Sequence, residues 1–567
     1  MFKENNKHRQ ESLFGFRKML SKAKFKKLTN SKAGYFYRLI FCNIDEKIFK
    51  PLYSDQKSRP NAPINTMVSA LILKREKGIT YRQLIEDIKF NIKTRYALGL
   101  QDLTGEPFSE TTLFNFQRRV NDYFVKTGID LIEQVFDDLT QQQLEQLDIK
   151  ADIQRTDSFL ISSNIRDYSR IELLVEVVKR FYRILSDADK KAYIDLFTDY
   201  KDKSSGKFIY DLSSADVPGE LKKLGQVYYQ IINNFADEYG HTNIFKTVQR
   251  VFSEHFTEIS DKVEVIPAQQ LSSGILQSPD DPEATYRNKR GQNVKGYSGN
   301  VTETANPDND LDLITDVGVE KNNVDDTKIL NKRLDRIQEK TPDIKELHTD
   351  GGYRSEENTE KLESEDIEHI TSAIRGPNAK VRMEIYREDG NYEVHCPRQK
   401  CLKVKKARKR YKAIFDNDEC QNCPFLDDCP THFRKRIKNR VYYFGEKDYE
   451  NSKKYRKFQN LPDKKKRIRP PIENTVKEFR RNENWKGKIW LRGKFKASLY
   501  ALTNAISINF RRIVKYIRSL VQNSSISTKL LRIYQSFNAV IINLVLLIKN
   551  HLNLQKQDPQ NFKYQNI

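Results

Sequence analysis

The chain has 567 residues and carries 100 Lys and Arg side chains against 77 Asp and Glu, a formal net charge of +23. At about 150 residues per domain, this length excludes one ordinary core and predicts three or four units. The charge favours a polyanionic partner, either nucleic acid or an anionic membrane surface. A Lys- and Asn-rich composition from an AT-rich genome would give the same total without any partner, so charge alone leaves both interpretations open.

Neither a signal peptide nor a membrane span is predicted. The N-terminal sequence lacks a continuous apolar core. The longest apolar run, residues 539–548, is shorter than the roughly 18 to 20 residues that cross a bilayer. We therefore expect a cytoplasmic protein without a membrane partner, associated with the nucleoid if it binds DNA. In that reducing compartment, clustered cysteines suggest a metal more than disulfides.

Three short helices are predicted near the N-terminus. Gly78 is placed to end the first, Thr80 to cap the second and Ser109 to cap the third. Their order resembles a helix-turn-helix whose last helix, with Arg118 and Arg119, would lie in a DNA major groove. The alternative is a plain helical bundle with a solvated basic face.

The middle of the chain predicts a mixed sheet. Near-alternation of Ile, Phe and Thr predicts a first strand within residues 148–164, and a later hairpin is expected to turn near Gly291. Residues 167–258 have helical periodicity. Without that block, the order is strand, strand, strand, helix, strand, helix, strand, which predicts a mixed sheet with helices on its faces.

We therefore expect a multidomain α+β chain. Its parts are an N-terminal all-helical DNA-binding module (1–130), a sheet domain assembled from 140–165, 265–375 and 467–520, a helical insertion (166–262), a Cys-rich basic insertion (376–466) and a C-terminal helical tail (521–567).

Three acidic residues fall where such a sheet could bring them together. Asp157 lies on the first strand, Asp350 ends the fourth, and Glu473 lies in the first turns of a helix that starts after two prolines. Converging carboxylates repel one another unless divalent cations neutralise them, and hard oxygen ligands suit Mg²⁺ or Mn²⁺. Two such ions could activate water or a 3′ hydroxyl for phosphodiester cleavage. Gly351 and Gly352 would accept positive φ and permit close approach of metal and phosphate.

Each of these acids taken alone is more often a helix cap or a surface charge, so the prediction depends on their conjunction. Two basic residues support it, because Arg469, Glu473 and Arg480 are spaced by four and seven residues. That spacing would place both arginines beside the acid on one helical face, where they could hold phosphates. Pro470 argues against including Arg469 in the helix itself. An ordinary ion-paired surface helix is the alternative.

The phrases ILQSPDDPEATYRNKRGQNVKGYSGNVTET and LHTDGGYRSEEN resemble those of the DDE transposases of bacterial insertion sequences, in particular the insertion-sequence 1182-like group. The resemblance runs from the N-terminal helices to about residue 515. It implies an RNase H-like catalytic core that cuts the ends of a mobile element and transfers the strands, with two Asp and one Glu on two Mg²⁺ ions. The implied partners are double-stranded DNA, as element inverted repeats and target, and a second copy of the chain.

Matched residue by residue, the same three acids take the family's catalytic positions. The family's signature around its Glu usually begins with a Tyr, continues with an Arg and ends in a Lys. Here Lys466 stands where the Tyr would be, Arg469 keeps the Arg position and Arg480 takes the Lys position. This departure affects the phosphate contacts more than the metal site.

Five of the six cysteines cluster within 34 residues of one another, as HCPRQKC and ECQNCPFLDDC. Cys420 and Cys423 form a CxxC pair, and with Cys396 and Cys429 they could close a tetrahedral Zn²⁺ site. The residues that could replace one ligand are Cys401, His395 and His432. Reduced, unpaired thiols are the alternative. Basic runs on both sides predict that this segment touches DNA.

Both tryptophans, Trp485 and Trp490, follow Glu473 closely. We expect them to pack in a core, with stacking on a flipped base at a cut DNA end as the alternative.

The function predicted from the sequence is that of a transposase. Two alternatives stay open: a catalytically inactive DNA-binding protein descended from such an enzyme, and a related nuclease that cuts without strand transfer.

Overall fold

The computed structural model describes residues 1–10, 12, 14–259, 262–289, 291–371 and 380–522. All but the first two residues of the predicted C-terminal tail, including the apolar run 539–548, lie outside this part of the chain. Within the described residues, no helix is both long and apolar enough to cross a membrane.

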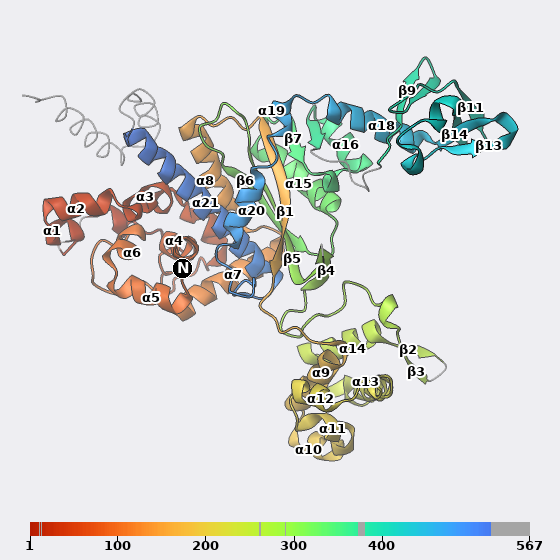
Figure 1. Cartoon of the computed structure of the whole chain (residues 1–567). Coiled ribbons are helices and arrows are strands. Elements are labelled where there is room, and N and C mark those ends of the chain that lie inside the picture. Colours follow the sequence, from red (N-terminus) through yellow and green to blue (C-terminus); the bar gives the residue numbers. More distant parts are fainter. Residues whose placement is uncertain (11, 13, 260–261, 290, 372–379, 523–567) are drawn as a thin grey trace, which may run out of the picture.

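Helices make up the N-terminal region, as predicted (Figure 1). They are α1 (Phe16–Met19), α2 (Lys22–Thr29), α3 (Lys32–Leu39), α4 (Ile64–Lys77), α5 (Tyr81–Phe90), α6 (Ile92–Ala97), α7 (Glu110–Thr127) and α8 (Leu131–Leu147), with 3-10 turns Lys7–Arg9, Phe41–Asn43 and Glu46–Leu52. The predicted caps are confirmed. Gly78 follows α4 in the left-handed conformation, Thr80 forms a reciprocal capping box with Gln83, and the Ser109 hydroxyl accepts the Thr112 N–H.

The three predicted helices are α4, α5 and α7, and they are not consecutive. Helix α6 and residues 98–109 separate α5 from α7, so these helices are not joined by a tight turn. The short turn at residues 78–80 instead joins α5 to α4, which is buried along most of its length. Because α4 lies within the apolar core, it holds the other helices in a bundle, which is the alternative that the sequence left open.

A six-stranded mixed sheet forms the centre of the molecule. Its strands are β1 (Ile153–Ser162), β4 (Thr285–Lys289), β5 (Gln292–Thr304), β6 (Ile314–Lys321), β7 (Glu346–Thr349) and β8 (Glu368–Thr371). Their order is β6-β5-β1-β7-β8, with β4 paired to the first residues of β5. The pairs β6-β5 and β5-β1 are antiparallel, and β1-β7 and β7-β8 are parallel. The predicted hairpin at Gly291 is confirmed, and the alternation of helices and strands from α15 to β8 is as predicted. Because the hairpin supplies two strands, β4 and β5, four strands rather than the predicted three precede α15.

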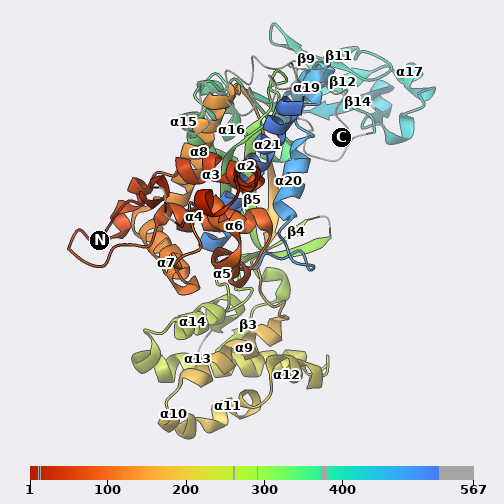
Figure 2. The same ribbon diagram turned by 90° about the vertical axis from the view of Figure 1, so that its left-hand side faces the viewer.

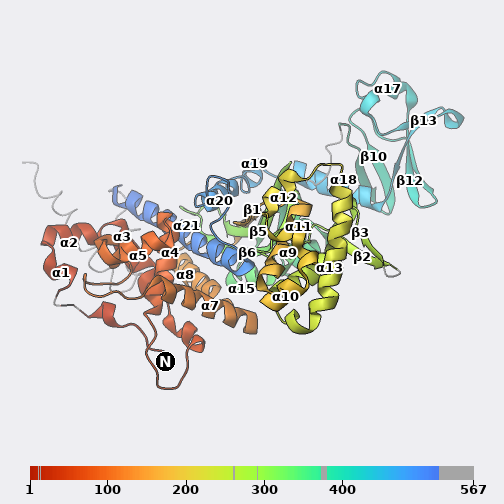
Figure 3. The same cartoon turned by 90° about the horizontal axis from the view of Figure 1, so that it is seen from below.

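Helices cover both faces of this sheet. Helices α15 (Asp326–Lys340) and α16 (Glu356–Ser364) share an apolar cluster with β7 on one face. On the other face lie α20 (Ile472–Arg480), which packs on β1, and α21 (Lys494–Gln522), which packs on β6. Figure 3 shows α21 between the N-terminal helices and the sheet. A single apolar cluster runs from Tyr35 of α3 through the sheet to Ile517 of α21, so the N-terminal helices and the sheet share one core.

Two further segments have small cores of their own. The first consists of α9 (Arg170–Ile184), α10 (Asp187–Ala192), α11 (Ile194–Lys201), α12 (Ser205–Asp211), α13 (Val217–Tyr239), α14 (Asn243–His255) and the hairpin β2–β3 (Phe256–Ile259, Lys262–Val265). It projects below the sheet in Figure 2. The predicted helical block therefore ends in a hairpin. Phe256 of β2 and Val263 of β3 pack against the helical core, and side chains alternate in direction along each of these strands.

The second segment contains the cysteine cluster. Its strands are β9 (Glu384–Glu388), β10 (Asn391–His395), β11 (Lys403–Ala407), β12 (Arg410–Phe415), β13 (His432–Arg434) and β14 (Asn439–Phe444), and its helices are α17 (Asn417–Gln421) and α18 (Glu446–Gln459). The last four strands form a sheet of order β11-β12-β14-β13. Figure 1 shows this segment at one end of the molecule, and the short helix α19 (Asp463–Lys466) leads from it back to the central sheet.

The expectation of core-packed tryptophans is wrong. Trp485 and Trp490 lie between α20 and α21 and are 89% and 61% exposed. A tight turn at Asn484 holds the first of them away from the core.

Two glycines test the packing of the N-terminal helices. Gly99 and Gly105 have nearly equal positive φ, +71° and +69°, but a Cβ on Gly99 would overlap the Phe41 ring, whereas a Cβ on Gly105 meets no atom within 4 Å. Each alanine substitution should cost about 1–2 kcal/mol for the left-handed conformation. Gly99→Ala should lower the free energy of unfolding by a further ~1–3 kcal/mol because of overpacking. Urea denaturation of both variants measures the difference, and equal losses would contradict the packing at Phe41.

Candidate active site

The three predicted acids come from adjacent elements. Side chains alternate along β1, so Asp157 faces the same side as Phe159, whose ring packs 4.7 Å from the ring of Phe479 on α20. Glu473 lies in the first turn of that helix. Asp350 directly follows β7, the parallel neighbour of β1. Because parallel strands end at the same edge of the sheet, Asp350 lies close enough to raise the pKa of Asp157 by repulsion.

Arg469 joins two of these acids. Its Nη2 donates to Asp157 Oδ2 at 2.7 Å, and its Nη1 lies 3.4 Å from Glu473 Oε1. Burial raises the pKa of Asp157, and the Arg469 guanidinium and the Ser158 N–H oppose that rise without cancelling it. Asp157 is almost buried, whereas the Glu473 side chain is 60% exposed. The guanidinium therefore holds together two carboxylates that differ greatly in their access to water.

Asp350 is oriented by its own loop. Its Oδ1 accepts the Gly352 N–H at 2.8 Å, and a Cβ on Gly352 would lie only 3.0 Å from that oxygen. The predicted positive φ is wrong, since neither Gly351 nor Gly352 has one. Glycine is needed at position 352 because the Asp350 carboxylate approaches its backbone closely. Tyr353, fully buried, accepts the Asn300 amide at 2.7 Å, which anchors the loop to β5.

A buried ion network fixes α20 against the sheet. Glu303 on β5 is fully buried and accepts hydrogen bonds from Arg155 Nε (2.7 Å), Arg512 Nη1 (2.8 Å) and the hydroxyl of Thr475 (2.7 Å). Arg155 also donates to the Ile468 carbonyl at 2.9 Å. Thr475 belongs to α20 and Arg155 to β1, so the network sets the separation of Glu473 from Asp157.

The donor atoms suit a hard cation, but they are not gathered around one point. Among the described residues, no three His, Cys, Asp or Glu side chains lie close enough together to hold one metal ion. Asp350 Oδ2 and Glu473 Oε2 accept no hydrogen bond from a described residue, whereas Asp157 Oδ2 is bonded to Arg469. A cation shared by the three carboxylates would therefore require the Arg469 guanidinium to move away.

Two family models match this chain: one described as "Transposase domain (DUF772)" at residues 25–119, and one described as "Transposase DDE domain" at residues 395–514. These two matches support a DDE transposase of an insertion sequence. Comparisons with curated proteins and with solved structures gave no match. The matched ranges include Arg118 and Arg119 of α7 and, in the second model, Glu473; Asp157 and Asp350 of the transposase lie outside both.

The predicted cysteine cluster of the transposase surrounds one pocket. Cys396, Cys420, Cys423 and Cys429 line it, and neither Cys401 nor a histidine is among the lining residues. Gln399 connects two of the thiols, because its N–H donates to Cys396 Sγ and its Nε2 to Cys420 Sγ, both at 3.2 Å. All six cysteines are free, and burial raises the pKa of Cys420 to about 11.

The predicted DNA-binding arginines are in three places on the transposase. Arg118 and Arg119 are exposed on α7, and the Arg119 guanidinium lies 5.3 Å from the centre of the Tyr53 ring. Arg480 is exposed in the last turn of α20. Arg469 precedes that helix, as Pro470 suggested, so it reaches Glu473 from outside the helix.

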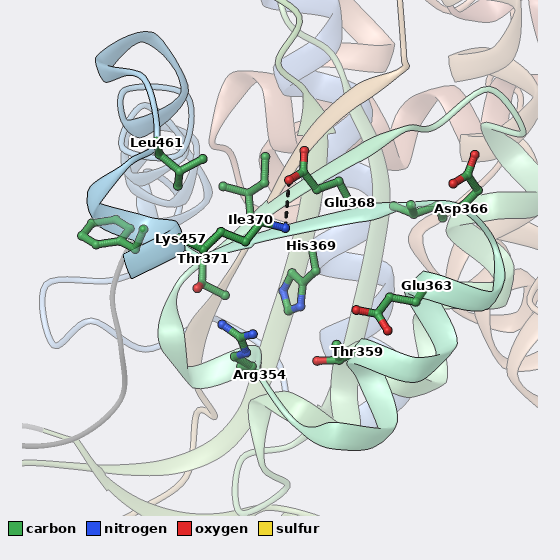
Figure 4. Close-up of a pocket in the computed structure, with 12 residues that line it drawn as sticks. Arg354, Thr359, Glu363, Asp366, Glu368, His369, Ile370, Thr371, Lys457 and Leu461 are labelled. Atoms are coloured by element: carbon green, nitrogen blue, oxygen red, sulfur yellow. Dashed lines mark ion pairs between the residues drawn. The ribbon is translucent and has the colours of Figure 1, made fainter. Parts of the chain in front are cut away.

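A pocket beside the acids lies between β8, α16 and α18 (Figure 4). His369 points into it, its pKa lowered to about 4 by burial, and its Nε2 lies 2.8 Å from the hydroxyl of Thr349, the residue before Asp350. The ion pair of Lys457 with Glu368 (3.0 Å) lies at its edge. None of the three acids lines this pocket, so it is separate from the place where they approach one another.

Sequence reasoning missed Glu303 and its partners. The available signal was a single glutamate in the strand GYSGNVTET, whose other residues are small, apolar or uncharged and are typical of a buried strand. A buried carboxylate requires charged partners, but the sequence does not reveal that they come from residues 155, 475 and 512.

The network is tested by comparing Glu303→Gln with Glu320→Gln. Glu320 lies on β6 and forms partly exposed pairs with Lys332 of α15 and Lys494 of α21, which this control breaks. Glu303→Gln removes the buried charge between Arg155 and Arg512, which keep only their more exposed partners Asp312 and Glu478. It should destabilise the protein by about 3–5 kcal/mol, whereas the Glu320 change should cost at most ~1 kcal/mol. Although burial raises the pKa of Glu303, Arg512 and Arg155 lower it below its ordinary 4.5.

The stabilisation by Glu303 is therefore present above about pH 4.5 and is lost as the pH falls through the lowered pKa of the folded state. Urea denaturation at pH 7 and at pH 4 measures both effects. Equal destabilisation by the two substitutions at pH 7 would show that the network contributes no more than surface pairs.

Proposed function

We propose that this transposase cuts DNA at the ends of its element and joins the freed 3′ ends to a target by metal-dependent phosphoryl transfer. The observation that carries the proposal is that Arg469 joins Asp157 to Glu473, while Asp350 follows the parallel neighbour of β1 and lies near enough to Asp157 to raise its pKa. If the guanidinium moved away, a divalent ion and a phosphate could take its place between the carboxylates.

The sheet supports an RNase H-like core. Three antiparallel strands (β6, β5 and β1) are followed by two that run parallel to β1, and helices cover both faces. This is the order implied by the sequence resemblance. It puts the first acid in the middle of β1 and the second at the end of its parallel neighbour.

In this proposal the three acids hold two Mg²⁺ or Mn²⁺ ions. When bound, such ions activate the attacking water or 3′ hydroxyl and stabilise the leaving oxygen. Gly352 keeps Asp350 Oδ1 fixed, so that Oδ2 is presented to the site. Arg469 leaves Asp157 and Glu473 and pairs with the DNA phosphate, for which its planar guanidinium is suited. Arg480 supplies a second phosphate contact from the end of α20.

DNA binding is assigned to two basic surfaces. One is the exposed face of α7 with Arg118 and Arg119. The other is the β11–β12 hairpin, residues 403–412, whose lysines and arginines are mostly exposed. The partners are double-stranded element ends and target DNA, held by a dimer or other homo-oligomer in the cytoplasm, at the nucleoid. Membership of the insertion-sequence 1182-like group is part of this proposal.

The cysteine pocket is proposed to hold one structural Zn²⁺ through Cys396, Cys420, Cys423 and Cys429. The Gln399 N–H that donates to Cys396 Sγ would orient a thiolate ligand, as hydrogen bonds to metal ligands do. Binding requires the thiols to lose their protons and to move closer than in the described geometry. The metal would then stabilise a segment whose own apolar core is small.

Asp350→Asn tests the proposed chemistry. Asn can still accept the Gly352 N–H, so the loop should fold, but it no longer supplies a carboxylate. Cleavage of end-containing DNA with Mg²⁺ should fall by at least about 100-fold, since even residues behind metal ligands affect activity 10–100-fold. Asp343→Asn, on the exposed loop before β7, is the control and should cleave normally.

Undiminished cleavage by Asp350→Asn would remove its proposed metal role. Cleavage by the unaltered protein without joined products would instead identify a nuclease, and salt-sensitive DNA binding without any Mg²⁺-dependent cutting would identify an inactive DNA-binding protein.

The zinc proposal is tested by elemental analysis of freshly purified protein. Cys423→Ser should lose one bound zinc per chain, whereas Cys401→Ser should retain it, because Cys401 Sγ accepts the Val394 N–H (3.3 Å) away from the pocket. Absence of zinc from the unaltered protein would contradict the proposal.

A further inference from the structure

The two tryptophans of the chain are both on its surface. Trp485 is 89% exposed and Trp490 is 61% exposed, and no other large apolar side chain between residues 477 and 496 is exposed to that degree. Leaving two indole rings in water is unfavourable, since these side chains carry the largest apolar surfaces. An exposed aromatic pair of this kind marks a contact surface.

The turn that carries Trp485 is rigid. Asn484 Oδ1 accepts the N–H groups of Lys486 (2.9 Å) and Lys488 (3.0 Å). The Asn484 N–H donates to the Lys488 carbonyl and the Gly487 N–H to the Asn484 carbonyl, both at 2.8 Å. Gly487 has the positive φ, +69°, that closes the turn. The indole is therefore held outward by a well-bonded backbone, and presenting it to a partner requires no ordering of the chain.

The same segment continues the strand that carries Asp157. Lys488 bridges in parallel to Ser162 at the end of β1, and the Ile489 N–H donates to the Ser162 carbonyl at 2.9 Å. Ile489 is buried, so alternation along this extended segment turns Trp490 outward. The segment between the two rings is thus tied to the end of β1, where Ser162 lies five residues beyond Asp157.

The surroundings of the rings are cationic. Residues 477–496 contain eight Lys and Arg and only two acids, Glu478 and Glu483. Three of these cations are paired with acids of other segments: Lys488 with Asp167, Arg492 with Asp280 and Lys494 with Glu320. Glu478 is paired with Arg511 and Arg512 of α21. Burial raises the pKa of Glu483 to about 7 despite the nearby Arg480, so this carboxyl is partly protonated near neutral pH. The Lys486 ammonium lies 4.7 Å from the Trp485 ring centre.

These features distinguish between two classes of partner. A protein partner would need apolar neighbours around the rings, but the exposed neighbours here are Lys477, Arg480, Arg481 and Lys486. Aromatic rings between cations are instead the pattern that binds single-stranded nucleic acid, in which bases stack on the rings and cations follow the phosphates. We propose that Trp485 and Trp490 form a stacking platform for unpaired bases of a DNA strand next to the candidate active site. This inference rests on the proposed function, because it takes the DNA strand to be a substrate.

The tryptophans supply the probe for the test. In full-length protein with Asp350→Asn and Trp490→Phe, all tryptophan fluorescence comes from Trp485. Acrylamide, a neutral quencher, should quench it strongly in the free protein. Saturation with a short single-stranded oligonucleotide, verified by the anisotropy of a dye on its end, should quench the emission and reduce acrylamide access several-fold. A blunt duplex of the same sequence should protect Trp485 less.

Substitutions separate stacking from charge. Trp485→Ala should weaken single-strand binding about 10-fold at constant salt, whereas Trp485→Phe should retain most of the affinity. Lys486→Gln is the matched neighbour: it should lower the salt dependence of binding and leave the protection of Trp485 intact.

Full acrylamide access to Trp485 in the saturated complex, or normal binding by Trp485→Ala, would overturn the proposal. Protection that grows with protein concentration without DNA would assign the rings to an interface between copies and would also overturn it. The measurement uses a variant expected not to cleave, so absence of cleavage by the unaltered protein would count against the proposed function and leave this test unaffected.

Discussion

The buried carboxylate of Glu303 is the interaction on which the candidate site depends. It lies on β5, but its partners are Arg155 of β1, Thr475 of α20 and Arg512 of α21. A fully buried charge is stable only with such partners. Separation of β1, α20 or α21 from β5 would therefore leave the Glu303 carboxylate exposed to water or buried without a partner. Asp157 is two residues from Arg155 and Glu473 is two residues from Thr475. The network therefore determines how far apart two of the three acids lie.

Helix α21 extends this constraint to the N-terminal helices. Its apolar side chains belong to the same core as α4 and β6. On its polar side, Arg511 pairs with Glu76 of α4 at 3.0 Å and with Glu478 of α20 at 3.1 Å. The helices proposed to bind DNA and the helix that carries Glu473 are thus connected through one rigid element. Movement of the N-terminal helices relative to the acids would have to disrupt the apolar core that these helices share with the sheet.

The distribution of charge gives the molecule two different regions. Cations lie on exposed elements such as the β11–β12 hairpin and the segment after α20, whereas in the candidate site Arg469 joins Asp157 to Glu473. Burial keeps the pKa of Asp157 above its ordinary value even beside that guanidinium. In the proposed function, the basic surface would attract the polyanion and the acids would hold the cation needed for metal-dependent chemistry on DNA.

The local sequence determined much of this. Thr80, Ser109 and Gly78 mark helix ends because capping uses only neighbouring residues, and the strand order followed from periodicity and turn residues. The three acids were identified by resemblance and by their positions: Asp157 on a strand, Asp350 at a strand end and Glu473 in a first helical turn. The tertiary structure alone decided which long-range partners they have. Arg469 reaches Asp157 across 312 residues, and Glu303 finds its arginines 148 and 209 residues away.

The exposure of Trp485 was also beyond the sequence. A tryptophan is usually read as a core residue because of its apolar area, and only the hydrogen-bonded turn at Asn484 shows that this one cannot turn inward. Periodicity and capping depend on contacts within a few residues, so they can be read from the chain. The pairing of charges and the direction of a side chain depend on which distant segments meet, and that is settled only when the sheet and its covering helices have packed.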